Sequence, residues 1–421
     1  MAKNTLLVCF QGSPIGFLKQ DKAGKLSFSY ESTAPKQLSL KMPVGKSPFG
    51  NEICEAFFGG LLPESDTARK LIARKFNADP GNTFSLLKAI GQDCAGAVSL
   101  HDPESPPTEP DGFHKLNATP ISEQELAKQI RNLKRAPLFT GLKGIRLSLA
   151  GVQDKAAVCV IDGQICIPEP GVPTSHILKA PIKDCEATVQ NEYLCMSAAF
   201  RLGIPTAKVE MRRAEDQTYL LVERYDRELT ADGKIRRIHQ EDFCQALGIV
   251  STNKYQAEGG PGLKECFDVL TNCEKPAQDR NTLAQVVILN YLLGNADAHG
   301  KNFSLLHTQP HLSRLAPLYD VLSVSVYDEL NQKMAMNIGG CYDMNEVQSE
   351  NWQTLCKEIQ YGYPAFRKEL ARQTDELMEA AEMVRKELAV SDFDTWVADD
   401  ILRVLQRSCN RVKETYNWEI T

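Results

Sequence analysis

The sequence has 421 residues, of which 43% are hydrophobic and 24% are charged. These values are typical of a soluble globular protein of two or three domains, whose core needs neither disulfides nor metals. The net charge of −6 does not favour binding of a polyanion by the whole chain. No run of about 18 apolar residues occurs, and the N-terminal apolar run is too short for a secretory signal. We therefore expect a cytoplasmic protein without a membrane span.

The thirteen cysteines do not indicate a disulfide framework. Their number is odd, no two have C-x-x-C spacing, and several lie inside apolar helical patterns: Cys195, Cys244, Cys266 and Cys356. This usage is typical of reduced thiols in a core, and it does not favour a zinc site.

The first hundred residues have the pattern of a small mixed domain. Strands are predicted at 6–10, 14–19 and 26–30, and a helix is predicted from 65 to 78 with Ser65 as its cap. Residues 101–120 then carry five prolines, a composition that sustains neither a helix nor a central strand. We place the first domain at residues 1–105.

A β-rich lobe is predicted at residues 106–240. Two apolar runs, 157–161 and 164–167, flank Asp162-Gly163, which is a strong hairpin signal. A strand at 175–179 comes next, and a helix with Val189, Tyr193, Met196 and Phe200 on one face ends near Gly203. A further strand is expected at 219–222.

Residues 241–421 are predicted to be mainly helical. A long apolar helix over 283–293 ends at Gly294, and a hairpin is expected from 303–306 and 312–318. The stretch 334–338 has no clear assignment. A β-rich lobe followed by a helical lobe indicates an α+β protein with a protein-kinase-like bilobal fold.

The loop after this helix contains the sequence Asp-Ala-His-Gly-Lys-Asn, residues 297–302. Phosphoryl transfer needs a carboxylate that orients the nucleophile and oxygen ligands for magnesium, and a protein kinase supplies them in a D-x-x-x-x-N loop. Asp297 and Asn302 have this spacing, and Asp320 follows the hairpin where a kinase places its second metal-binding aspartate. For each residue taken alone, a simple turn is the more common explanation: a capped turn after a helix for Asp297 and Asn302, and a turn at a strand end for Asp320. Their order together with the helix and hairpin favours a kinase.

The upstream lobe offers the parts that hold ATP in a kinase. Lys179 is on a predicted strand and Glu192 is on the following helix, as in the lysine–glutamate pair of protein kinases. An edge-strand lysine and a solvated helix glutamate are the alternative. Residues 148–155 are the candidate phosphate-binding loop. They contain one glycine, whereas the loop of ordinary protein kinases has the pattern G-x-G-x-x-G. A plain turn before a strand is the alternative explanation of this segment.

The chain resembles the HipA family of bacterial serine/threonine-protein kinase toxins. Seven blocks in the same order carry the resemblance: SLAGVQDK at 148–155, PTSHILK at 173–179, NEY at 191–193, VERYDR at 222–227, QEDFCQALG at 240–248, DAHGKNF at 297–303 and PLYDVLS at 317–323.

The resemblance implies roles for particular residues. Asp297 would be the catalytic base, Asn302 and Asp320 would bind magnesium, and Ser148 would be autophosphorylated, which silences the kinase in this family. Segment 223–225 would be the hinge beside adenine. The resemblance implies these ATP contacts: Ala150, Gly151, Val152, Gln153, Asp154, Lys155, Lys179, Glu223, Arg224, Tyr225, His299, Gly300, Lys301, Asn302, Tyr319 and Asp320.

The same resemblance implies partners. These are a helix-turn-helix antitoxin of HipB type, operator DNA reached mainly through it, and a protein substrate such as an aminoacyl-tRNA synthetase. Residues 339–343 lack lysine and arginine where family members can carry a DNA-contacting basic segment, so direct DNA contact is not expected from them. Two alternatives stay open: a small-molecule phosphotransferase, and a catalytically silent corepressor module.

Overall fold

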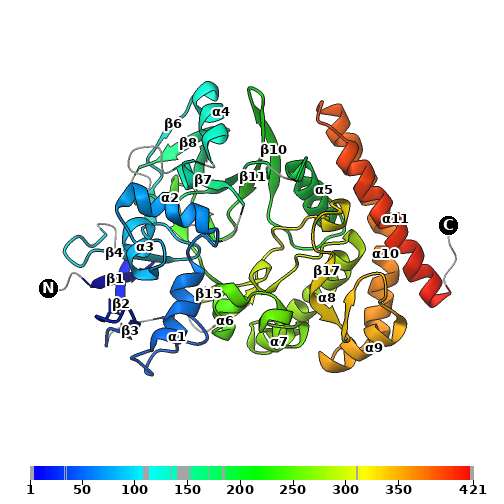
Figure 1. Cartoon of the computed structure of the whole chain (residues 1–421), viewed down its shortest axis with the longest axis horizontal. Helices are drawn as coiled ribbons and strands as arrows, with labels where there is room; N and C mark the ends of the chain where they lie inside the picture. The colour runs from blue at the N-terminus through cyan, green and yellow to red at the C-terminus, as the bar shows by residue number, and fades with distance from the viewer. Residues whose placement is uncertain are drawn as a thin grey trace. The chain divides into compact units, whose positions relative to one another are not determined.

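The computed structural model describes residues 4–32, 34, 36–107, 113–133, 135–139, 150, 153–169, 171–182, 185–309 and 312–417. The chain separates into two compact units. Figure 1 labels their helices and strands. Unit 1 comprises Met1–Ala180, Arg212–Thr252 and Ser304–Ser313, and unit 2 comprises Pro181–Met211, Asn253–Phe303 and Arg314–Thr421.

Unit 1 begins with an antiparallel sheet in the order β3-β2-β1-β4. Buried aromatic side chains such as Phe28, Phe57 and Phe58 fill its core. The hydroxyl of Ser65 accepts a hydrogen bond from Ala68 N, as expected of a helix cap. The elements are β1 (Thr5–Phe10), β2 (Ser13–Gln20), β3 (Leu26–Tyr30), α1 (Asn51–Cys54), a π turn (Glu55–Gly59), α2 (Asp66–Phe76), α3 (Thr83–Ile90) and β4 (Val98–His101).

A second sheet in unit 1 has the order β10-β11-β9-β7-β8-β6. Asp162 and Gly163 form the two-residue turn between β7 and β8, with positive φ angles of 50° and 77°, as a type I′ hairpin requires. Leu126 and Ile130 of α4 belong to a core that also contains Val158 and Leu178. The elements are β6 (Ala118–Pro120), α4 (Glu123–Asn132), β7 (Lys155–Ile161), β8 (Gln164–Pro168), β9 (His176–Lys179), β10 (Val209–Ala214) and β11 (Gln217–Glu223).

Two small sheets follow, with the orders β12-β13-β5 and β14-β15-β16. Their elements are β5 (Phe113–Lys115), β12 (Arg227–Leu229), β13 (Lys234–Arg237), β14 (His239–Asp242), α6 (Phe243–Leu247), β15 (Ser304–Gln309) and β16 (Leu312–Leu315).

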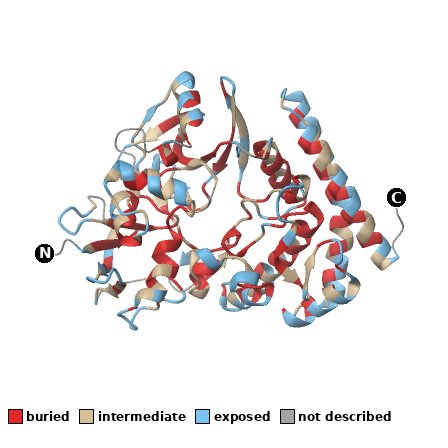
Figure 2. Cartoon of the chain, in the orientation of Figure 1, coloured by how far each residue is buried: buried red, intermediate tan, exposed pale blue. Residues whose placement is uncertain are grey.

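Unit 2 is mainly helical, and its helices show their packing faces in Figure 2. In α11 the buried residues recur every three or four positions, from Val397 through Ile401 and Leu405 to Val412, so one stripe faces the core. The elements are α5 (Thr188–Arg201), α7 (Leu263–Val269), α8 (Pro276–Leu293), β17 (Lys333–Ile338), β18 (Cys341–Asp343), α9 (Ser349–Glu358), α10 (Tyr363–Val390) and α11 (Trp396–Tyr416). Short 3-10 turns lie at Pro137–Phe139, Ser251–Asn253, Gln256–Glu258, Leu270–Asn272, Gly300–Asn302 and Val324–Val326.

The α+β class is confirmed, as are the predicted strands of the first hundred residues and the apolar helix before Gly294. The proline-rich segment holds two three-residue strands, β5 and β6, which the sequence analysis did not predict. Each is the edge strand of its sheet, where proline is tolerated. The domain boundaries at 105 and 240 stay a prediction. Among the described residues, no helix is long and apolar enough to cross a bilayer.

Candidate active site

The loop that carries Asp297 starts at a sharp turn after α8. Gly294 ends this helix with a φ of 68°, in the left-handed region that favours glycine. A Cβ on Gly294 would lie 2.7 Å from the side chain of Ser325, so the turn also requires a residue without a side chain. The carbonyl of Gly294 accepts hydrogen bonds from Val324 N and Ser325 N, both at 3.0 Å. Gly294 thus brings the loop beside the segment that follows Asp320.

The side-chain amide of Asn302 links two candidate site residues. Its nitrogen donates to the carbonyl of Asp297 at 3.2 Å and, over a longer contact of 3.5 Å, to the carbonyl of Asp320. Amide and carboxylate oxygens, as on Asn302 and Asp320, are ligands that a hard cation prefers, and their binding of magnesium stays a prediction. The two residues are in contact within unit 2 through this amide.

The loop between Asp297 and Asn302 is closed by main-chain hydrogen bonds. His299 N donates to Asp297 O at 2.8 Å, and Asn302 N donates to His299 O at 2.9 Å. His299, Lys301 and Asn302 are buried, whereas the side chain of Asp297 is exposed. The predicted base is thus exposed, while the residues that follow it in the loop are buried. Such packing favours a fixed position of the Asp297 carboxylate.

Asp320 itself has a φ of 59°, a conformation that non-glycine residues adopt rarely and mainly when neighbouring contacts hold them. Several contacts hold this segment. The hydroxyl of Tyr319 donates to Lys301 O at 2.7 Å, and Leu318 exchanges main-chain hydrogen bonds with Pro205 and Ala207. Left-handed backbone at a candidate metal ligand points to a functional constraint.

Asn191 is a site residue whose role the sequence analysis did not assign, although it lies in one of the seven blocks. Its amide nitrogen donates to Ser323 O at 2.9 Å, and its amide oxygen accepts from Ser323 N at 2.8 Å. This fully buried side chain on α5 therefore fixes the chain three residues after Asp320. Asn191 lies on the side of α5 opposite the apolar face predicted from the sequence, so the apolar pattern gave no signal for its burial.

Tyr255 is the second residue that the sequence analysis missed. Its hydroxyl donates to Oδ1 of Asp297 at 2.6 Å, and its ring packs edge-on against His299 with centroids 5.2 Å apart. Tyr255 and Asp297 are 42 positions apart, and the segment between them includes all of α7 and α8. No local sequence pattern could pair two residues at this separation.

Two lysines that were predicted to contact ATP face each other in unit 1. Lys155 at the start of β7 is the direct cross-strand partner of Lys179 at the end of β9. Lys155 Nζ donates to Ala150 O at 2.6 Å, and the side chain of Gln153 donates to Ala180 O at 2.9 Å. Like charges directly opposite each other are unfavourable in a sheet, so this pair requires negative charge nearby.

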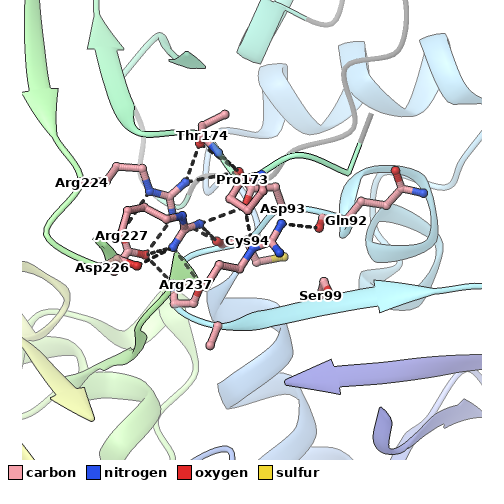
Figure 3. Close-up of polar contacts among 12 residues, drawn as sticks. Gln92, Asp93, Cys94, Ser99, Pro173, Thr174, Arg224, Asp226, Arg227 and Arg237 are labelled. Carbon is pink, nitrogen blue, oxygen red and sulfur yellow. Dashed lines mark hydrogen bonds and ion pairs between the residues drawn. The ribbon is translucent and has the colours of Figure 1, made fainter. Parts of the chain in front are cut away.

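The predicted hinge segment, residues 223–225, follows β11. Arg224 N donates to Ser175 O at 3.0 Å, which continues the pairing of β11 with the chain around β9. The side chain of Arg224 is buried and donates to Thr174, Cys94 and Asp226, as Figure 3 shows. Glu223 is exposed and Tyr225 is half-buried. The Arg224 side chain is thus occupied by protein contacts, and its role in ATP binding stays a prediction.

The electrostatics around Arg224 are those of a buried ion cluster. Burial opposes the charge of Asp93, but Arg227, Arg224 and Arg237 more than offset it and hold the pKa of this carboxyl below its ordinary value. Burial, with repulsion from Arg224, lowers the pKa of Arg227 to about 10. These groups stay ionised at neutral pH.

Three site residues lie outside the described part of the chain: Ser148, Gly151 and Val152. Lys179 and Glu192 are both buried, on β9 of unit 1 and α5 of unit 2, and their pairing stays a prediction. Among the described residues no group of three or more His, Cys, Asp or Glu side chains is placed to hold a metal. The predicted magnesium site accordingly rests on one amide and one carboxylate.

Comparison with known proteins identifies the family. Residues 147–388 match the model of the HipA-like C-terminal domain, and residues 6–101 match that of the HipA N-terminal domain. The chain belongs to the HipA family. It is 41% identical over 392 residues to the Sinorhizobium fredii protein Y4mE, which is provisionally named a kinase, covering 91% of this chain and 92% of that protein.

Two HipA proteins extend this comparison. The chain is 31% identical to the serine/threonine-protein kinase toxin HipA of Shewanella oneidensis over 324 residues, covering 74% of this chain and 72% of that protein. A solved complex of Shewanella oneidensis HipA with HipB and operator DNA contains a chain that superposes with a TM-score of 0.84 at 25% identity, covering 98% of both chains. The predicted family and fold are therefore confirmed.

Proposed function

We propose that this HipA-family chain is an ATP- and magnesium-dependent serine/threonine-protein kinase. The observation that carries the proposal is the side chain of Asn302, which ties the main chains of Asp297 and Asp320 together in one unit. A kinase needs these three positions in fixed geometry, because its rate enhancement comes mainly from positioning and charge stabilisation.

The chemistry assigned to each residue follows from its surroundings. The exposed carboxylate of Asp297 accepts the proton of a substrate hydroxyl, and the Asn302 amide oxygen and Asp320 carboxylate hold magnesium. When bound, magnesium would neutralise negative charge on the phosphates of ATP. The opposed lysines 155 and 179 of unit 1 hold the ATP phosphates.

The activity is tested by incubating the purified chain with labelled ATP, with and without magnesium. We expect phosphate on the chain, including Ser148, and its loss in Asp297→Gln. Asp268→Asn is the matched control, because Asp268 is exposed and pairs with Lys264 on α7, so labelling should persist. No labelling of the wild type, or equal labelling of Asp297→Gln, would overturn the proposal.

We also propose that the kinase is the toxin of a toxin–antitoxin pair. The Shewanella oneidensis HipA structure, which contains HipB and operator DNA, supports an antitoxin of HipB type for this chain. We expect this antitoxin to be a helix-turn-helix protein. Gly339 and Gly340 form the turn of the β17–β18 hairpin. Residues 339–343 contain no lysine or arginine to contact DNA phosphates, and this supports DNA contact through the antitoxin.

For the protein substrate we propose a component of translation such as an aminoacyl-tRNA synthetase. Phosphosite mapping by mass spectrometry after incubation of the chain with purified synthetases tests this step. A phosphorylated serine or threonine that depends on Asp297 supports it. Phosphorylation of small alcohols but of no protein would instead favour a small-molecule phosphotransferase.

A further inference from the structure

A buried cluster of five charged side chains lies within unit 1 (Figure 3). Asp93 follows α3, and Asp226 follows β11. They meet three guanidinium groups, those of Arg224, Arg227 and Arg237, and each of the five side chains is at most 5% exposed. Two carboxylates thus face three cations inside the protein. The cluster joins the segment after α3 to the segment after β11.

Asp93 is the carboxylate that the N-terminal domain contributes to this cluster. It accepts hydrogen bonds from Arg227 Nη2 at 2.9 Å, Arg237 Nε at 3.2 Å and Thr174 Oγ1 at 2.9 Å. It also forms an ion pair with Arg224 Nη1 at 3.5 Å. One carboxylate therefore contacts the residue two positions before β9, the residue that follows β11, the first residue of β12 and the last residue of β13.

Arg224 is the middle residue of the predicted hinge segment. Its guanidinium donates to Thr174 Oγ1 at 2.9 Å, to Cys94 O at 3.0 Å and to both oxygens of Asp226. Its main-chain nitrogen is held by Ser175 O. Both the side chain and the backbone of Arg224 are therefore fixed, which sets the position of Glu223 and Tyr225 on either side of it.

The fit between the two segments is also steric. Gly96 N donates to Asp226 Oδ2 at 2.7 Å, and Gly96 has a φ of 72°. A Cβ on Gly96 would lie 2.7 Å from the main-chain nitrogen of Gln240, so the segment after α3 approaches β14 as closely as glycine allows. Arg227 adds a hydrogen bond to Gly96 O at 3.0 Å.

A buried ion cluster is weak evidence for stability, because well-packed apolar side chains in its place are often as stable. What charged groups add is direction: the hydrogen bonds of this cluster, which leave the buried Nε of Arg227 without a partner among the described residues, form in one arrangement of the two segments. We propose that Asp93 is a positioning residue that holds segment 223–225 in the geometry that binds the adenine of ATP. This inference rests on the proposed kinase function and on the hinge role that the family resemblance implies for segment 223–225, and it gives the N-terminal domain a role in nucleotide binding.

The test uses the full chain and compares ATP binding with stability. Asp93→Asn keeps the shape of the side chain but leaves three guanidinium groups with one carboxylate. Thr174→Val is milder, because it removes only the hydroxyl that joins Asp93 to Arg224. We expect the dissociation constant of ATP and its KM in autophosphorylation to rise by about tenfold in Asp93→Asn and about threefold in Thr174→Val, while kcat changes by less than about twofold.

A control variant separates positioning from general destabilisation. Glu55 accepts a hydrogen bond from Thr83 Oγ1 at 2.7 Å in the same domain, and neither residue contacts the cluster. Glu55→Ala removes the acceptor of this bond, so it should lower the melting temperature and leave the affinity for ATP unchanged. Equal ATP affinity in wild type, Asp93→Asn and Thr174→Val would overturn the inference, as would equal weakening by Glu55→Ala.

Two further outcomes are decisive. If Asp93→Asn does not fold, ATP binding by Thr174→Val decides alone. If the wild type itself binds no ATP, the proposed function fails and this inference fails with it. A wild type that binds ATP, with variants that bind it equally well, refutes only the role of Asp93.

Discussion

The phenolic hydroxyl of Tyr255 donates a hydrogen bond of 2.6 Å to Oδ1 of Asp297. A carboxylate has two oxygens, so this contact leaves Oδ2 for a substrate hydroxyl while it restricts rotation of the group. The edge-on packing of Tyr255 against His299 holds the phenol itself in place. Tyr255 is thus a positioning residue for the proposed base.

The first prediction is that Tyr255→Phe slows the proposed reaction. Loss of one hydrogen bond to an exposed carboxylate should lower kcat by about three- to tenfold and leave the KM for ATP unchanged. Steady-state autophosphorylation measures both constants. Tyr361→Phe is the matched control, because Tyr361 donates a similar 2.7 Å bond to Asn281 away from the loop. An increased kcat in Tyr255→Phe would mean that the phenol competes with substrate.

The second prediction separates the two roles of Asn302. Asn302→Asp retains an oxygen ligand but replaces the donor to the carbonyls of Asp297 and Asp320 with a second acceptor. We expect activity to fall by roughly 10–100-fold at every magnesium concentration, because the loop loses its link to the Asp320 segment. A magnesium titration of the rate checks this. Full activity at high magnesium would show that the amide nitrogen is dispensable.

The third prediction concerns the turn at Gly294, where φ is 68° and the space for a side chain is filled by Ser325. Gly294→Ala should lower the free energy of unfolding by about 1–3 kcal/mol, from backbone strain and crowding together. Gly203→Ala is its control: φ is 77°, but no atom lies within 4 Å of the added Cβ. Thermal melts should show a larger loss for Gly294→Ala, and equal losses would remove the crowding argument.

Much of the fold was predictable because local patterns determine it. The Asp162-Gly163 hairpin, the Ser65 cap and the helix that ends at Gly294 each depend on residues within a few positions of one another. The spacing of Asp297 and Asn302 is likewise local. Their link to Asp320 was expected from a resemblance, and the structure supplies its physical basis in the Asn302 amide.

The remainder depends on contacts between distant residues. Asp93 and Arg237 are separated by 144 positions, and Asn191 and Ser323 by 132. A sequence pattern cannot distinguish a buried arginine in an ion cluster from a solvated one, since burial is set by tertiary packing. The resemblance implied an ATP contact for Arg224, and the structure adds that its side chain is occupied within the cluster of Figure 3. The ATP contact of this residue stays a prediction.

The last prediction concerns pH and follows from His239 in β14. Nε2 of its ring donates to Leu38 O at 2.7 Å, and Nδ1 accepts from Ala97 N at 3.4 Å, so the buried ring is neutral. Burial, reinforced by His307 with its ring centroid 4.9 Å away, lowers the pKa of His239 to about 3. The unfolded chain has a pKa near 6.5 at this position and binds a proton that the folded chain does not.

Stability from His239 is therefore fully present above about pH 6.5 and is lost as the pH falls through 6.5 toward 3. Between pH 7.5 and 5 the free energy of unfolding should fall by about 2 kcal/mol from this residue. His101, whose pKa burial lowers to about 4, acts in the same direction. Denaturant titrations at the two pH values should show a smaller fall for His239→Gln than for wild type, because glutamine does not titrate. An identical fall in both proteins would contradict the neutral state of the buried ring.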